Sequence, residues 1–139
     1  VGSDSFDDPS LDALAEQDPS ILDRVFFGTL APAISGSRIE KFQTDCAEVG
    51  VEVNGLFPSL GGDMIKVIEY GITASSSLEP ASIRAAIRAA DSIPVMSVSS
   101  ISFKDTKSYA LRDIPVIGFK NGQRVLLSQN IPTNVPSWP

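Results

Sequence analysis

A β-hairpin near the end of this 139-residue chain is the feature that most restricts its fold. Asn121-Gly122 stands between two short runs rich in β-forming residues, 115–119 and 124–127. Asn-Gly is the preferred pair for a two-residue type I′ turn, because the twist of that turn matches the twist of the strands it joins. The pair therefore predicts an antiparallel hairpin, and the proline-rich residues 130–139 that follow are expected to be extended.

Three amphipathic segments precede the hairpin, each with apolar residues at helical spacing. The predicted helices cover about 37–49, 59–74 and 79–90. Ser37 and Glu40 form a capping box that begins the first of them. Gly61-Gly62 lies in the first turn of the second helix, where glycine weakens helical structure. The glycine pair indicates that another part of the protein approaches this helix closely.

Shorter segments with β-forming residues lie on both sides of these helices. Residues 24–30 form an apolar run with turn residues at either end, which predicts a buried strand. Short runs at 95–98 and 101–103 are predicted to be strands as well. A short helix is expected to begin at Asp8-Pro9 and to end at Asp18-Pro19. These readings predict a chain that contains both helices and strands.

The charge of the chain, its lack of histidine and its single cysteine limit the classes of function that it can have. The formal net charge is −6 at pH 7, and an acidic surface repels phosphate backbones, so nucleic acid is not an expected partner. The chain has no histidine, which is the commonest general base and metal ligand. Cys46 is the one cysteine, so the chain can form neither an intrachain disulfide nor a cysteine zinc site. Cys46 lies in a helical apolar series and is interpreted as a buried structural thiol, with a reactive thiol as the alternative.

Sequence motifs of common enzyme classes are also missing. No Gly-x-Ser-x-Gly, Gly-x-Gly-x-x-Gly, Ser-x-x-Lys or P-loop pattern occurs in the sequence. We therefore expect no enzyme activity, no cofactor and no metal site. A hydrolase that uses two carboxylates stays an open alternative, because acidic residues are plentiful.

Several segments, taken in order, resemble the type I periplasmic-binding family of branched-chain amino acid transport systems. They are 1–11, 60–68, 83–87, 101–105 and the hairpin over 115–125. Val1-Gly2-Ser3-Asp4 is similar to the Gly-x-Asp or Gly-x-Glu that precedes a helix in the family's second lobe. Leu60 to Ile68 resembles the family's Tyr-Asp-Ala helix with its aliphatic stripe, although Gly62 stands at the tyrosine position.

The family fold has two α/β lobes joined by three crossing strands, with the ligand held between the lobes. The resemblance implies that this chain is the C-terminal part of such a fold, with helices packed on a mainly parallel sheet and a terminal hairpin. In that plan residues 1–31 end the second lobe, 32–113 return into the first lobe, and 114–139 come back near the hinge. An N-terminal portion of the same protein would be missing, and the isolated chain is expected to self-associate through its uncovered surfaces.

The function implied by the resemblance is that of the solute-binding subunit of an ABC importer. Such a subunit captures an amino acid or a similar small polar ligand between its lobes and delivers it to the transporter permease. Its location would be periplasmic, or extracytoplasmic as a bacterial lipoprotein. Two alternatives stay open, namely a ligand-sensing regulatory domain of the same fold and an independent α/β enzyme.

Three residues are candidates for the ligand site. Asp4 matches the acid that holds the ligand's ammonium in amino-acid-binding members of the family; alternatively it caps or solvates a helix start, together with nearby acids. Phe57 matches an aromatic that faces the cleft in some relatives, with packing in the core or hinge as the alternative. Thr29 lies at the end of the predicted apolar strand, where α/β folds present ligand-binding loops. Asp63 is interpreted as a first-turn acid stabilised by the helix dipole, without a functional role.

Overall fold

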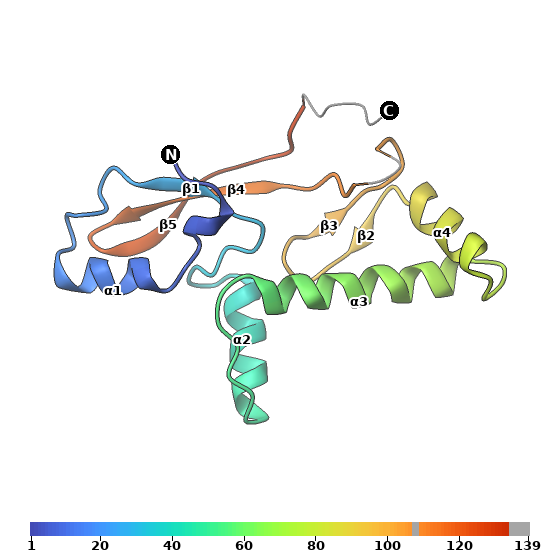
Figure 1. Cartoon of the computed structure of the whole chain (residues 1–139), viewed down its shortest axis with the longest axis horizontal. Helices are drawn as coiled ribbons and strands as arrows, with labels where there is room; N and C mark the ends of the chain where they lie inside the picture. The colour runs from blue at the N-terminus through green and yellow to red at the C-terminus, as the bar shows by residue number, and fades with distance from the viewer. Residues whose placement is uncertain (107–108, 134–139) are drawn as a thin grey trace.

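The chain folds into an elongated molecule with two parts, one built on a three-stranded sheet and the other on a long helix (Figure 1). The structure is a computed structural model, and it describes residues 1–106 and 109–133. Of the extended tail predicted over 130–139, residues 134–139 therefore lie outside the described residues. Two segments, 29–37 and 109–113, connect the two parts.

The first part joins the beginning and the end of the chain in one sheet. Its elements are the 3₁₀ helix η1 (Asp4–Phe6), α1 (Ser10–Gln17), β1 (Phe26–Gly28), β4 (Ile114–Lys120) and β5 (Gln123–Asn130). The strands are ordered β1-β4-β5, and α1 packs on them (Figure 1). Ala15 of α1 joins Phe27, Ile117 and Phe119 of the sheet in a buried hydrophobic cluster. This core holds together two stretches of chain that are far apart in the sequence.

The predicted C-terminal hairpin is confirmed, and its turn lies at the predicted position. Lys120 pairs with Gln123 across the turn. Both turn residues have positive φ, 53° at Asn121 and 77° at Gly122, as a type I′ turn requires. The short helix expected after Asp8-Pro9 is confirmed as α1, and the strand predicted over 24–30 is confirmed in its central residues as β1.

The second part is built on the long helix α3. Its elements are α2 (Arg38–Glu48), α3 (Phe57–Ala74), α4 (Pro80–Ala89), β2 (Ile93–Pro94) and β3 (Ser100–Ile101). α4 packs against α3 at Gly71, where the missing side chain leaves room for Ile83 and Ile87. The two-stranded sheet β2-β3 covers a second hydrophobic cluster, to which Val67 and Tyr70 of α3 contribute.

The three helices predicted in this region are confirmed, with boundaries that shift by at most two residues. Ser37 caps α2 as expected, because its hydroxyl oxygen accepts a hydrogen bond from the N–H of Glu40 (3.1 Å). The Glu40 carboxylate in turn accepts one from the N–H of Gly36 (2.6 Å). α3 begins at Phe57 rather than at residue 59. The strand expected at 95–98 is wrong, because those residues lie between β2 and β3, and the strand expected at 101–103 is confirmed at Ile101 alone, the last residue of β3.

The strand directions differ from the expected mainly parallel sheet. β1 pairs antiparallel with β4, β4 with β5, and β2 with β3. Among the described residues, parallel pairing occurs as one isolated bridge, between Gly2 and Phe27. The reason is the path of the chain: it leaves the first part at the end of β1 and re-enters at β4 from the same side (Figure 1), which reverses the strand direction. The α/β class is confirmed, but the parallel sheet is wrong for these strands.

α2 projects away from both parts of the molecule (Figure 1). Its one buried residue is Ile39, which packs with Ala31 and Leu56 in a small third cluster. Cys46, which the sequence predicted to be buried, is a partly exposed free thiol on this helix. The helical spacing around Cys46 was read correctly, but the contacts that bury Ile39 at the start of this face do not extend as far as Cys46.

Candidate functional site

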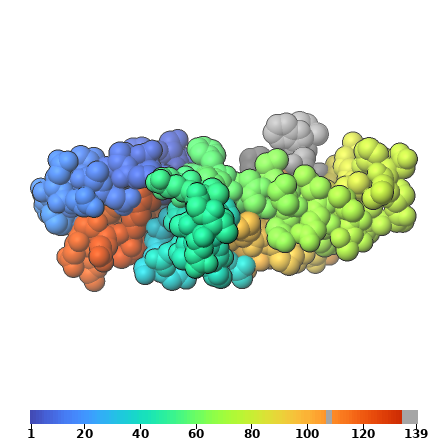
Figure 2. Space-filling view, turned by 90° about the horizontal axis from the view of Figure 1, so that it is seen from below, coloured from blue at the N-terminus to red at the C-terminus, as the bar shows by residue number. Residues whose placement is uncertain are grey.

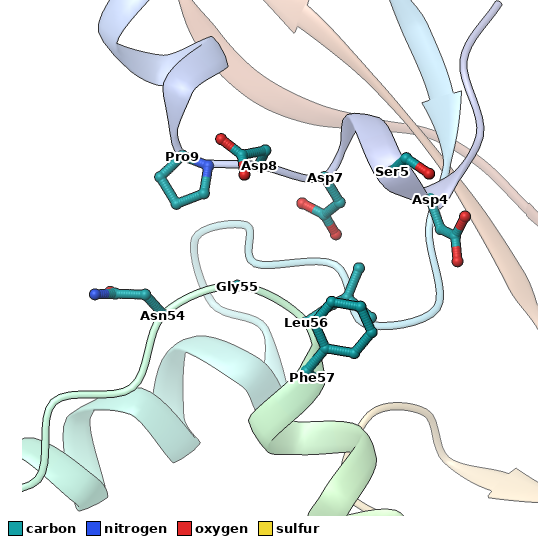
Figure 3. A pocket seen from close by; sticks show the side chains of 9 residues that line it. All are labelled: Asp4, Ser5, Asp7, Asp8, Pro9, Asn54, Gly55, Leu56 and Phe57. Atoms are coloured by element: carbon teal, nitrogen blue, oxygen red, sulfur yellow. The ribbon is translucent and has the colours of Figure 1, made fainter.

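A cleft of about 350 Å³ lies between the two parts of the molecule, at the start of α3 (Figure 3). One wall is the segment 4–9, which contains η1 and leads into α1, and the other is the segment 54–57, which leads into α3. The lining residues are Asp4, Ser5, Asp7, Asp8, Pro9, Asn54, Gly55, Leu56 and Phe57. Two of the three predicted site residues, Asp4 and Phe57, thus line the same cleft from opposite walls.

Asp4 is positioned by the way the chain enters η1. The N–H of Gly2 donates to the carbonyl of Phe26 (2.9 Å), and the N–H of Gly28 donates to the carbonyl of Gly2 (3.3 Å), so residue 2 is tied to β1. A methyl group at Gly2 would lie 2.6 Å from Cγ of Phe6, so the turn into η1 needs glycine there. The Asp4 side chain is exposed, and its carboxylate makes no hydrogen bond or ion pair with the described residues.

Asp7 is the buried acid of the same wall, and its charge is already compensated. Its carboxylate forms an ion pair with the guanidinium of Arg124 and accepts a hydrogen bond from the hydroxyl of Thr29. Arg124 also donates through Nε to Asp12 (2.8 Å), and it lies over the rings of Phe27 and Phe119. Burial by itself would lower the pKa of Arg124, but Asp12 and Asp7 outweigh that effect and raise the pKa above its usual value.

Asp8 faces the cleft near the start of α1, and its carboxylate is hydrogen-bonded to the backbone of that helix. Its Oδ1 accepts a hydrogen bond from the N–H of Ser10 (2.8 Å). Hydrogen bonding from Ser10 lowers the pKa of the Asp8 carboxyl below its usual value. Of the three acids that line the cleft, Asp4 is therefore the one whose carboxylate has no hydrogen-bond or ion-pair partner among the described residues.

The opposite wall presents an aromatic side chain. Phe57, the first residue of α3, is 79% exposed, so it does not pack in the core, which was one part of its alternative role in the core or hinge. Leu56 beside it is buried and anchors the wall in the cluster around Ile39. Gly55 has a φ of 73°, a conformation that favours glycine, and it turns the chain into the helix. The cleft therefore offers an anion on one side and an apolar ring on the other.

Thr29 lies behind the cleft rather than in its lining. Its side chain is 1% exposed, and its hydroxyl is occupied by the donation to Asp7 and by a hydrogen bond accepted from the N–H of Ala31 (3.2 Å). It supports the wall through Asp7. Its predicted role in ligand binding would thus be indirect, one hydrogen bond away from the cleft surface.

Asp63 has a different role from the one that the sequence suggested. Because α3 begins at Phe57, Asp63 lies beyond the first turn, and it is 6% exposed. Its Oδ1 accepts hydrogen bonds from the N–H groups of Met96 (2.7 Å) and Ser97 (2.9 Å). The interpretation as a first-turn acid stabilised by the helix dipole is wrong, since the carboxylate ties the segment after β2 to α3.

Arg112 extends this buried cluster to both connecting segments. It lies 3.6 Å from Oδ2 of Asp63, and it donates to the hydroxyl of Ser97 (2.6 Å) and to the carbonyl of Leu30. Burial lowers the pKa of Arg112, and the nearby Asp63 opposes that shift. Leu30 and Arg112 belong to the two different segments that connect the parts. This arginine therefore fixes the segments to each other beside the second part.

Sequence reasoning missed the partners of both buried arginines. Arg124 and Asp7 are 117 positions apart in the sequence, and Arg112 and Asp63 are also far apart. A run of four acids at the start of the chain, Asp4, Asp7, Asp8 and Asp12, was the available signal. It showed that carboxylates gather there, but the local sequence does not show which of them an arginine neutralises.

Metal and membrane sites are not found among the described residues. No group of three or more cysteine or acidic side chains in the described ranges is arranged to hold a metal ion. No helix within residues 1–106 and 109–133 is both long enough and apolar enough to cross a bilayer.

Comparisons with known proteins support the fold. No family model matches the chain, and a search of curated proteins found no match. Among solved structures, the chain is similar to the crystal structure of the leucine-binding protein LivK from Thermotoga maritima MSB8, with a TM-score of 0.64 and 23% sequence identity. The match covers 94% of this chain and 36% of LivK, so the chain spans about a third of the length of its structural neighbour. The chain thus has the fold of a part of a type I periplasmic-binding protein.

Proposed function

We propose that this chain supplies part of the ligand cleft of a solute-binding protein that captures an amino acid or a similar small amine. The single observation that carries the proposal is the position of Asp4. Its uncommitted carboxylate shares a cleft with the exposed ring of Phe57, which extends from the other part of the molecule. A carboxylate beside an apolar wall suits a ligand with an ammonium group and an aliphatic or aromatic side chain.

Two further observations support an amine rather than an anion as the ligand. The cleft lining contains three carboxylates and no lysine or arginine. The structural neighbour is a leucine-binding protein, which makes leucine the first ligand to test. The fold alone is no argument for the same ligand, because one fold hosts many functions.

The experiment is calorimetric titration of the full product of the gene that encodes this chain, with leucine as the first ligand and the other amino acids after it. Asp4→Asn should weaken binding about 10- to 100-fold, since a hydrogen bond to a charged group contributes about 1.5–3 kcal/mol. Glu16→Gln is the matched control, because Glu16 is an exposed acid on α1 outside the cleft lining and should leave binding unchanged.

A ligand analogue makes the test specific for the ammonium group. 4-Methylpentanoate has the side chain and carboxylate of leucine but lacks the ammonium. Wild-type protein should prefer leucine strongly over the analogue, and Asp4→Asn should lose most of that preference. Equal discrimination by both proteins would show that Asp4 does not contact the amine and would refute the proposal.

The proposal also includes delivery of the ligand to an ABC permease and an extracytoplasmic location. Both rest on the family resemblance of the sequence. Cell fractionation and co-purification with a permease would test them. A fused or neighbouring signalling protein would instead favour the alternative, a ligand-sensing regulatory domain.

A further inference from the structure

A second chamber continues the cleft at its end near Pro9 and Asn54. Its volume is about 270 Å³. In Figure 3 these two residues lie at the end of the cleft opposite to Asp4 and Phe57. The cleft and the chamber share four lining residues, Asp7, Pro9, Asn54 and Gly55. Drug-sized ligands occupy cavities of about 300–1,000 Å³, so the cleft and the chamber together have room for a ligand longer than leucine.

Gln43 of α2 lines the chamber, and the packing of that helix positions it. Ile39, one turn earlier on the same helix face, is 1% exposed and packs with Ala31 and Leu56. Figure 2 shows α2 at the molecular surface between the first part and α3. The Gln43 side chain is partly buried, and its carboxamide makes no hydrogen bond with the described residues. This carboxamide is therefore available to a ligand that enters the chamber.

The other polar groups of the chamber leave mainly acceptors for a ligand. All three nitrogens of Arg124 donate within the protein, Nε to Asp12 (2.8 Å) and the other two to the Asp7 carboxylate and a backbone carbonyl. Asp12 is 46% exposed, and its second carboxylate oxygen accepts no hydrogen bond from the described residues. Asn54 donates through Nδ2 to a neighbouring glutamate (3.1 Å), which leaves its side-chain oxygen open. Such a chamber suits a ligand group that donates hydrogen bonds.

The charge of the two linings favours a cation in the chamber as well. The carboxylates are those of Asp4, Asp7, Asp8 and Asp12, against the one guanidinium of Arg124. A cleft lined mainly by charges of one sign concentrates ligands of the opposite sign. Because Arg124 is already paired, neither lining offers an unpaired cation to an anionic group. The end of the ligand that reaches the chamber is therefore expected to be basic.

We propose that the ligand of this protein carries two basic groups joined by an aliphatic chain. One group binds at Asp4, and the other binds in the second chamber at Gln43 and Asp12. The aliphatic chain passes Pro9 and Gly55, which line the cleft and the chamber without a polar side chain. Basic amino acids and linear diamines share this chemistry. The inference rests on the proposed function, because it takes Asp4 as the site of the first ammonium group.

The test is calorimetric titration of the full gene product with two matched pairs of ligands. Lysine has the carbon chain of norleucine with an added terminal ammonium group, and cadaverine differs from pentylamine in the same way. In at least one pair the dibasic ligand should bind about 10-fold more tightly, as expected for one hydrogen bond that involves a charged group. Lysine compared with cadaverine then shows whether the preferred ligand keeps a carboxylate.

Substitutions at Gln43 make the test specific for the chamber. Gln43→Met removes the carboxamide and keeps the length of the side chain, so it should reduce the dibasic preference about 3- to 10-fold and leave affinity for the monobasic ligand unchanged. Gln43→Glu adds a carboxylate beside the second basic group and should enlarge the preference. Gln17→Met is the matched control, because it makes the same change at the exposed last residue of α1, outside both linings.

Equal affinity within both ligand pairs would overturn the inference, and so would a Gln43→Met variant that keeps the full dibasic preference. If Asp4→Asn still weakens every amine in that case, the proposed function stands and the inference alone fails. If Asp4→Asn weakens none of them, or if no amine binds, the proposed function fails and the inference fails with it. The two failures are therefore distinguishable from the same set of titrations.

Discussion

Gly71→Ala should destabilise the protein by displacing α4 from α3. Gly71 is buried in the middle of the contact between these helices. A methyl group there would lie 2.8 Å from Cγ1 and Cδ1 of Ile87 and 2.9 Å from Cγ2 of Ile83. Both neighbours are β-branched and have few rotamers in a helix, so they cannot swing away easily. Overpacking of this kind costs about 1–3 kcal/mol.

The same substitution also improves helix propensity, and a matched variant separates the two effects. Alanine is favoured over glycine in a helix interior by about 1 kcal/mol. Gly61→Ala has this gain without a clash, since no atom lies within 4 Å of the added methyl group. The 139-residue chain should therefore become about 0.5–1 kcal/mol more stable with Gly61→Ala. The difference between the two variants isolates the packing cost, and it should be about 1–3 kcal/mol.

The assay is urea unfolding of the 139-residue chain, followed by circular dichroism at 222 nm. The urea midpoints of the two variants should move in opposite directions or differ clearly, with unchanged slopes. Adding Ile87→Val to Gly71→Ala removes the Cδ1 atom that the new methyl group contacts, and should recover part of the loss through a coupling above about 0.5 kcal/mol. A difference between the variants below about 0.5 kcal/mol would refute the argument from close packing.

Two further predictions concern the first part of the molecule. Arg124→Met should cost about 3–5 kcal/mol in urea unfolding, because it leaves the buried carboxylate of Asp7 without its cation, and a loss below about 1 kcal/mol would contradict the role of the pair. Gly122→Ala should cost about 1–2 kcal/mol, because alanine is strained at a φ of 77° and its methyl group would lie 3.2 Å from the carbonyl oxygen of Ala15. Calorimetry that shows no drop in Tm for this variant would contradict the turn geometry.

Local patterns in the sequence predicted the local structure well. Asn121-Gly122 and the Ser37–Glu40 pair each act within a few residues, through backbone conformation and capping hydrogen bonds. Such effects do not depend on the rest of the fold, so the sequence around them is enough to place a turn or a helix start. The same holds for the close approach at Gly62, although the sequence did not identify Met96 as the neighbour.

Features that depend on the path of the whole chain could not be predicted in the same way. β1 and β4 are separated by the entire second part of the molecule, so their antiparallel pairing follows from where the chain returns and not from either strand. The burial of Asp63 depends on where α3 begins and on the segment after β2 that reaches its carboxylate. Each of these required a partner from a distant part of the sequence.

The acids near the start of the chain show how the structure makes the binding proposal testable apart from folding. Asp7 and Asp12 form ion pairs with Arg124, and Asp8 accepts a hydrogen bond from the N–H of Ser10. Substitution of any of these three acids would therefore remove a contact that stabilises the fold. Asp4 makes no such contact with the described residues. Asp4→Asn should therefore leave the stability of the unliganded protein within about 0.5 kcal/mol of wild type, as exposed substitutions usually do. A loss of amine binding in that variant would then report on the ligand contact itself, because the wall that carries Asp4 stays folded.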